Sequence, residues 1–211
     1  MKKSIITLIV FLMAGSAFSQ KKPLDHSVYD TWKSVGAFTM SDDGKYTSYM
    51  VREQEGDGYV EVLNLLTFDR NSIDRATQPK LTPDGKFLIA TIKPFFKETK
   101  EARLKKTKPD QMPKDTLGIY NVYTKELKKI PNLKSLKIGR YGKDFIAFQS
   151  NAPADTTGGK KPAKKEKNQG EDLMVHYLAT GVTDTLKDVS DYNFTTGGDS
   201  LFLLRRPSSK D

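Results

Sequence analysis

The 211-residue sequence contains no cysteine, which excludes disulfide bonds, thiolate metal sites and cysteine nucleophiles. It has no Gly-x-Ser-x-Gly nucleophile motif, no P-loop and no dinucleotide fingerprint. Only two histidines occur, His26 and His176, and the sequence identifies no paired acid for either. The fold must therefore be held by its core alone, and we assign no catalytic, cofactor-binding or metal-binding residue.

Long apolar runs are also lacking, apart from Ile5–Ala14 near the N-terminus. Lys2 and Lys3 precede this run, and Ala17-Phe18-Ser19 follows it with small residues at the positions that a signal peptidase reads. Ten helical residues rise only about 15 Å, roughly half a bilayer core, so we expect no stable membrane span. The pattern predicts a cleaved signal peptide at 1–19 and a periplasmic or secreted protein.

The net charge of +9 is concentrated in two polar segments. Residues 95–114 carry seven bases against three acids, and residues 151–170 carry five bases against two acids. Together with Lys2 and Lys3 they account for the whole excess. A nucleic-acid surface would place its charge on one folded face with aromatic side chains, whereas the second segment has no aromatic residue. We therefore expect solvated inserts and no nucleic-acid partner.

Four segments of the chain resemble one another as an apolar strand, a polar turn with glycine and a second apolar strand. They are Phe38–Glu53, Pro79–Pro94, Leu136–Ser150 and Tyr192–Pro207, with Gly44, Gly85, Gly142 and Gly198 in their turns. Glycine takes the positive φ that a hairpin turn needs without steric cost. The glycine spacings are 41, 57 and 56, and removing the two inserts brings the period near 41. A period of roughly 40–45 residues with four strands is typical of β-propeller blades.

The segments between these pairs supply further strands, rich in β-branched and aromatic residues. They are Tyr59–Phe68, Thr116–Tyr123, Leu127–Ile130, Asp172–Leu178 and Thr183–Lys187. We expect little helix in the mature chain beyond a short amphipathic stretch at Val28–Val35. The fold class is therefore all-β, a partial β-propeller of about three and a half four-stranded blades.

The boundaries follow from the same repeat. A lead-in segment covers 20–35, and the incomplete propeller covers 36–211, with polar inserts at 95–114 and 151–170. The blades are expected at about 36–78, 79–133, 134–188 and 189–211. Because a propeller protects its sheet edges by closing its ring, we expect the chain to be a fragment of a larger protein or to need a partner chain.

Four stretches resemble secreted bacterial peptidases of the prolyl oligopeptidase family. They are the opening LDHSVYDTWKSVG at 24–36, the SDDGKY and TPDGKF turns, and the insert KPFFKETKEARLKKTKPDQMPKDTLGIYNV at 93–122. The resemblance implies an N-terminal propeller that restricts peptide access to a C-terminal α/β-hydrolase domain of the same chain, and hence peptide substrates. That domain would carry the nucleophile, so this portion would be non-catalytic.

Four other features imitate functional sites. His176 lies between Val175 and Tyr177, where an ordinary strand position is expected. Gly198-Asp199-Ser200-Leu201 spells an esterase motif but aligns with the hairpin turns. Asp42-Asp43-Gly44 followed by Glu53 imitates a calcium loop but lacks its intervening ligands. Glu98 and Glu101 lie one helical turn apart, although they are not the adjacent glutamates with which dipeptidyl members of the family hold a substrate amino group.

The sequence leaves three functional hypotheses. The first is the gating propeller of an exported serine-type peptidase. The second is a stand-alone periplasmic propeller that binds a protein or an envelope polymer. The third is a structural partner that completes its ring by oligomerising. The coding sequence downstream of the fourth blade would discriminate them.

Overall fold

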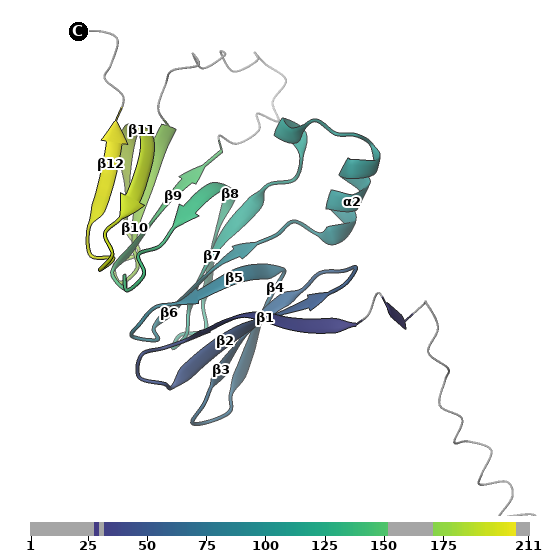
Figure 1. Cartoon of the computed structure of the whole chain (residues 1–211), viewed down its shortest axis with the longest axis horizontal. Coiled ribbons are helices and arrows are strands. Elements are labelled where there is room, and N and C mark those ends of the chain that lie inside the picture. The colour runs from purple at the N-terminus through teal and green to yellow at the C-terminus, as the bar shows by residue number, and fades with distance from the viewer. Residues whose placement is uncertain (1–27, 30–31, 152–170, 206–211) are drawn as a thin grey trace, which may run out of the picture.

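The computed structural model describes residues 28–29, 32–151 and 171–205, which form an all-β fold with one α-helix (Figure 1). The predicted signal peptide, His26 and nearly all of the second insert lie outside the described residues. The strands are β1 (Lys33–Met40), β2 (Tyr46–Glu53), β3 (Tyr59–Asn64), β4 (Arg70–Asp74), β5 (Ala76–Leu81), β6 (Phe87–Ile92), β7 (Asp115–Asn121), β8 (Leu127–Lys137), β9 (Phe145–Ser150), β10 (Glu171–Tyr177), β11 (Thr183–Phe194) and β12 (Leu201–Arg205). No helix in these ranges is long and apolar enough to cross a bilayer.

Every strand pairs antiparallel with its neighbour in the chain, as β1–β4 in one sheet and β5–β12 in a second. Left-handed backbone at Arg75, Asn132 and Asp188, with φ near 60°, divides this order into repeats. Arg75 separates β4 from β5, Asn132 interrupts β8 and Asp188 interrupts β11. We define unit 1 as β1–β4, unit 2 as β5 to residue 130, unit 3 as residues 133–187 and the final hairpin as residues 189–205.

The central strands of units 2 and 3 are buried on both faces, and consecutive side chains of one strand pack into different cores. Leu88 and Ala90 pack with unit 1, whereas Ile89 between them packs with unit 3. In β9, Ile146 faces unit 2 and Ala147 faces the final hairpin. The three resulting cores join successive units, and Figure 1 shows the units side by side in chain order. Burial on both faces explains why these strands are continuously apolar instead of alternating.

Three of the four predicted hairpin turns contain a hydrogen bond from a serine or threonine hydroxyl to an aspartate of the same turn. The hydroxyl of Ser41 donates to Asp43 at 2.7 Å, and that of Thr82 donates to Asp84 at 2.7 Å. Thr195 donates to Asp199 at 2.8 Å in the final hairpin. The glycines of these three turns have φ between 67° and 78°, as the sequence predicted.

The turn of unit 3 differs, and the prediction of a left-handed Gly142 is wrong. Gly142 is not among the glycines with positive φ. A Cβ there would lie 2.9 Å from the carbonyl oxygen of Gly198, and a Cβ on Gly139 would lie 2.5 Å from the Cα of Gly198. Glycine is therefore needed because two turns touch through their backbones.

Three further expectations are corrected. The expected strand Tyr59–Phe68 ends at Asn64, whose side-chain oxygen accepts bonds from the amides of Leu66 and Thr67 and begins a turn. The sequence did not place the polar strand β4 that comes next. The segment Val28–Val35 is not a helix throughout, because β1 begins at Lys33. The first insert also contains helix α2 (Phe96–Leu104) and the 3-10 turn η3 (Pro109–Gln111).

Candidate functional site

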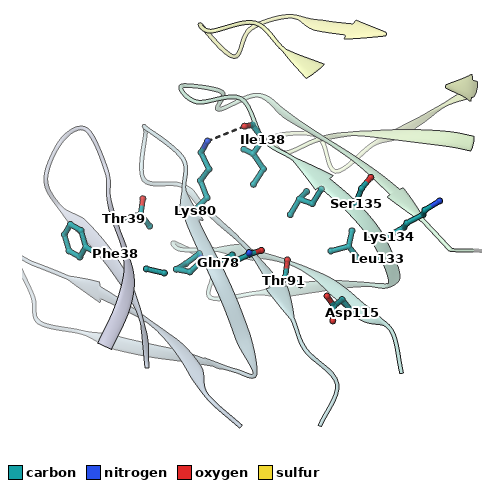
Figure 2. Close-up of a pocket in the computed structure, with 13 residues that line it drawn as sticks. Phe38, Thr39, Gln78, Lys80, Thr91, Asp115, Leu133, Lys134, Ser135 and Ile138 are labelled. Atoms are coloured by element: carbon teal, nitrogen blue, oxygen red, sulfur yellow. Dashed lines mark hydrogen bonds between the residues drawn. The ribbon is translucent and has the colours of Figure 1, made fainter. Parts of the chain in front are cut away.

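The first strands of units 1, 2 and 3 line a common cavity of about 690 Å³, which we call the inner cavity. Phe38 and Thr39 come from β1, Gln78 and Lys80 from β5, and Ser135 from the second half of β8 (Figure 2). Left-handed residues in β1 and β5, Ala37 and Gln78, coincide with register shifts that bend these strands. The repeat thus brings three equivalent strands to one concave wall.

Lys80 crosses this wall and ties unit 2 to unit 3. Its ammonium donates to the carbonyl oxygen of Gly139 at 2.8 Å and to that of Ile138 at 3.4 Å (Figure 2). Burial lowers the pKa of Lys80, and the nearby Arg140 lowers it further. The ammonium is therefore committed to backbone carbonyls of the next unit.

A second hollow of about 840 Å³ lies between the β2–β3 loop and the first insert, and we call it the α2 cleft. The amide of Phe96, at the start of α2, donates to the Asp57 carboxylate at 2.8 Å. Lys100 pairs with Glu55 at 2.7 Å. Because α2 has no side-chain cap of its own and no buried residue, these contacts with the loop of unit 1 hold it in place.

The α2 cleft contains four carboxylates and five basic side chains. Each carboxylate has a partner: Glu53 pairs with Lys33, Glu55 with Lys100, Asp115 with Lys93, and Asp57 accepts the Phe96 amide. The bases are Arg52, Arg75, Lys93, Lys100 and Arg103. Apolar side chains, among them Phe96, Leu104 and Met112, complete the lining.

Arg75 links the insert to the junction between units 1 and 2. Its guanidinium donates to the carbonyl oxygen of Lys93 at 3.1 Å and lies 3.8 Å from the centre of the Phe95 ring. Asp115 lines both the inner cavity and the α2 cleft. The two hollows therefore meet at Asp115, the first residue of β7, directly after the insert ends.

His176 occupies a strand position, as expected, and it is almost fully buried, at 2% exposure. Its Nδ1 lies 2.7 Å from the hydroxyl of Thr183 on the neighbouring strand. Burial lowers the pKa of His176, with a smaller contribution from Lys128. It lines neither the inner cavity nor the α2 cleft.

The residues of the other candidate motifs are also not brought together. Asp199 and Ser200 belong to the β11–β12 turn, where Asp199 accepts the Thr195 hydroxyl. Asp43 accepts the Ser41 hydroxyl and the Lys45 amide in the β1–β2 turn. Glu98 and Glu101 lie on α2 but do not line the cleft beside it.

Sequence reasoning missed both hollows, because each is made by segments far apart in the chain. A signal for α2 was nevertheless present. Phe96–Leu104 reads FKETKEARL, in which lysine, glutamate, alanine, arginine and leucine all favour helix. Its polar composition made it look like a solvated loop, and its docking depends on Glu55 and Asp57, some 40 residues earlier.

No protein-family model and no curated protein matches the sequence. Among solved structures, the chain is similar to the β-propeller domain of the Trilobed protease from Pyrococcus furiosus, with 14% identity, a TM-score of 0.50 and coverage of 81% of this chain and 48% of that one. The chain is also similar to an acylaminoacyl peptidase in complex with Z-Gly-Gly-Phe-chloromethyl ketone, with 13% identity and a TM-score of 0.49. That likeness covers 84% of this chain and 28% of the peptidase. The likeness to TolB from Acinetobacter baumannii has 15% identity and a TM-score of 0.42, and covers 85% of this chain and 39% of TolB.

The chain thus spans less than half of each of these solved chains. At such low identity the likeness concerns the fold alone. The sequential four-stranded units, the cores between them and the likeness to the Trilobed protease domain together show that the fold is of the β-propeller type.

Proposed function

We propose that the repeat units are propeller blades, three complete and one half-built, in the N-terminal part of an exported serine-type peptidase of the prolyl oligopeptidase type. This part catalyses nothing itself. It restricts which peptides reach an α/β-hydrolase domain of the same protein. The sequence resemblance over 24–36 and 93–122 supports the family, and the propeller fold is consistent with it.

The observation that carries the proposal is the inner cavity. Phe38, Gln78 and Ser135 belong to the first strands of three successive units and line one hollow. In a closed ring the equivalent strands of all blades would surround a central channel. A channel whose width is fixed by strands tied together, as Lys80 ties units 2 and 3, would admit peptides by size.

Export is part of the same proposal. The N-terminal segment 1–19 has the composition of a cleaved signal peptide, and the cysteine-free residues 20–211 would need no disulfide formation after export. N-terminal sequencing of the protein recovered outside the cytoplasm should then start at Gln20. A mature protein that retained Met1 would contradict export by cleavage.

The first experiment is to read the coding DNA beyond the codon of Asp211 in all three frames. The proposal expects further glycine-turn repeats, then a Gly-x-Ser-x-Gly motif followed by an aspartate and a histidine. A stop codon with no such coding sequence would overturn it and leave a binding propeller.

Gating itself is tested in that longer product. Residues 1–211 contain no cysteine, so once any cysteine of the downstream part has been changed to serine, Phe38→Cys can be labelled uniquely with a bulky maleimide. Labelling should slow hydrolysis of peptides of about ten residues while leaving a small chromogenic substrate unaffected. Leu66→Cys, 69% exposed in the β3–β4 loop, is the labelled control. Equal rates for the labelled Phe38→Cys and Leu66→Cys proteins on long peptides would contradict gating through the inner cavity.

A further inference from the structure

In the α2 cleft, all of the acidic side chains but only some of the basic side chains have partners. Its four carboxylates are all engaged, and Lys93, Lys100 and Arg75 have the partners described above. The guanidinium groups of Arg52 and Arg103 have no hydrogen-bond or ion-pair partner among the residues that the structure describes. The cleft therefore has two free guanidinium groups and no free carboxylate. A ligand for it would have to supply the negative charge.

The two arginines come from different elements, so the site exists only when the insert is docked. Arg52 lies near the end of β2, and Arg103 lies in the last turn of α2. Arg52 extends across β1, because a Cβ built on Gly36 would lie 3.3 Å from its Nη2 atom. The bare backbone at Gly36 thus leaves room for the Arg52 guanidinium.

The rest of the lining indicates which other groups a ligand of the cleft would have. Phe96, Leu104 and Met112 offer apolar surface, and the volume of about 840 Å³ lies in the range of sites that hold small ligands or short peptides. Guanidinium groups bind carboxylates through paired hydrogen bonds that fix orientation. An apolar side chain next to a carboxylate would match both parts of the cleft.

We propose that the α2 cleft binds a short peptide by its carboxylate, which Arg52 and Arg103 receive. This rests on the proposed function, since it names the class of peptide that the channel would meet first. Asp115, shared by both hollows, marks where the bound segment would pass from the cleft toward the inner cavity. A carboxylate held on the insert side would orient the peptide with its other end toward the inner strands.

The test is direct binding of fluorescein-labelled peptides of about five residues to the full chain, read by fluorescence anisotropy, with no peptidase activity required. A peptide ending in Ala-Leu with a free carboxylate is compared with its C-terminal amide. We expect the amide to bind at least about tenfold more weakly, and added salt to weaken the acid peptide more. An amide peptide whose last residue is glutamate carries a side-chain carboxylate but no terminal one. Its affinity therefore shows which of the two carboxylates the cleft binds.

Arg52→Gln and Arg103→Gln should each weaken binding of the acid peptide by about tenfold and leave the amide peptide unchanged. Lys97→Gln removes the same charge from an exposed position of α2 that does not line the cleft, and should change neither. Gly36→Ala should weaken the acid peptide by displacing Arg52 while thermal unfolding shows a retained fold. Equal binding of acid and amide peptides, or equal effects of Lys97→Gln and Arg103→Gln, would overturn the proposal without affecting the gating test.

Discussion

At the residue scale, Asp43 is the titrating group of the β1–β2 turn. The hydroxyl of Ser41, and after it the amide of Lys45, lower the pKa of Asp43 from 3.8 to about 2. Because folding favours the carboxylate, its contribution is complete above about pH 4 and is lost as the pH falls toward 2. Asp43→Asn should therefore lower the urea midpoint at pH 7, and its difference from the native protein should vanish near pH 2.

Asp42→Asn is the matched control for that experiment. It removes the same charge from the neighbouring exposed position and leaves the bond between Ser41 and Asp43 in place. A difference between Asp43→Asn and the native protein that is constant from pH 7 to pH 2 would contradict the account.

His176 gives the opposite direction of titration. Its folded pKa lies below the ordinary 6.5 because burial disfavours the imidazolium. The unfolded chain then binds the proton more readily, so stability is lost as the pH falls below about 6.5. His176→Gln keeps a polar partner for Thr183 but does not titrate. Its melting temperature should fall less between pH 7.5 and pH 5 than that of the native protein.

At the element scale, the packing between β6 and β7 depends on a glycine. A Cβ on Gly118 would lie 2.8 Å from Cδ1 of Ile92 on the neighbouring strand. Gly118→Ala should therefore cost about 1–3 kcal/mol, although alanine is otherwise the better strand residue. Ile92→Val removes the Cδ1 atom and should cost about 0.5–1.5 kcal/mol alone.

The double variant tests that contact. If the 2.8 Å approach is the cause, Gly118→Ala with Ile92→Val should cost less than the two single changes added together. Urea unfolding of the four proteins measures this coupling. Strict additivity would show that Gly118 is needed for another reason.

Some elements of the fold could be predicted from the sequence alone, and others could not. Apolar pairs around Gly44, Gly85 and Gly198 predicted their hairpins, because turn chemistry acts over a few residues. The strand β4 was missed because RNSID is polar, with only Ile73 deeply buried. The role of Gly139 could not be predicted, since it is needed by the backbone of Gly198, far along the chain. The α2 cleft could not be predicted either, because it is also made by segments far apart in the chain.

At the scale of the whole molecule, β12 is the exposed end of the second sheet. It pairs only with β11, and Phe202 and Leu204 are 68% and 64% exposed. An open strand with apolar side chains favours association. We expect residues 20–211, expressed alone, to associate with rising concentration in analytical ultracentrifugation and to bind a hydrophobic dye.

The double change Phe202→Lys with Leu204→Lys should reduce both signals, because charge on an edge strand opposes pairing. Leu66→Lys with Phe68→Lys places the same two charges at similarly exposed residues of the β3–β4 loop, and should leave both signals unchanged. A native chain that stays monomeric at all concentrations would contradict this view of the β12 edge.

Unit 1 is built wholly from β1–β4, four consecutive strands, and each later unit is added in the same order. No strand has to wait for a distant part of the chain before it can pair. Local pairing of this kind lowers the entropy of loop closure during folding. In the export that we propose, the chain could therefore assemble one unit on the last while the remainder is still being threaded.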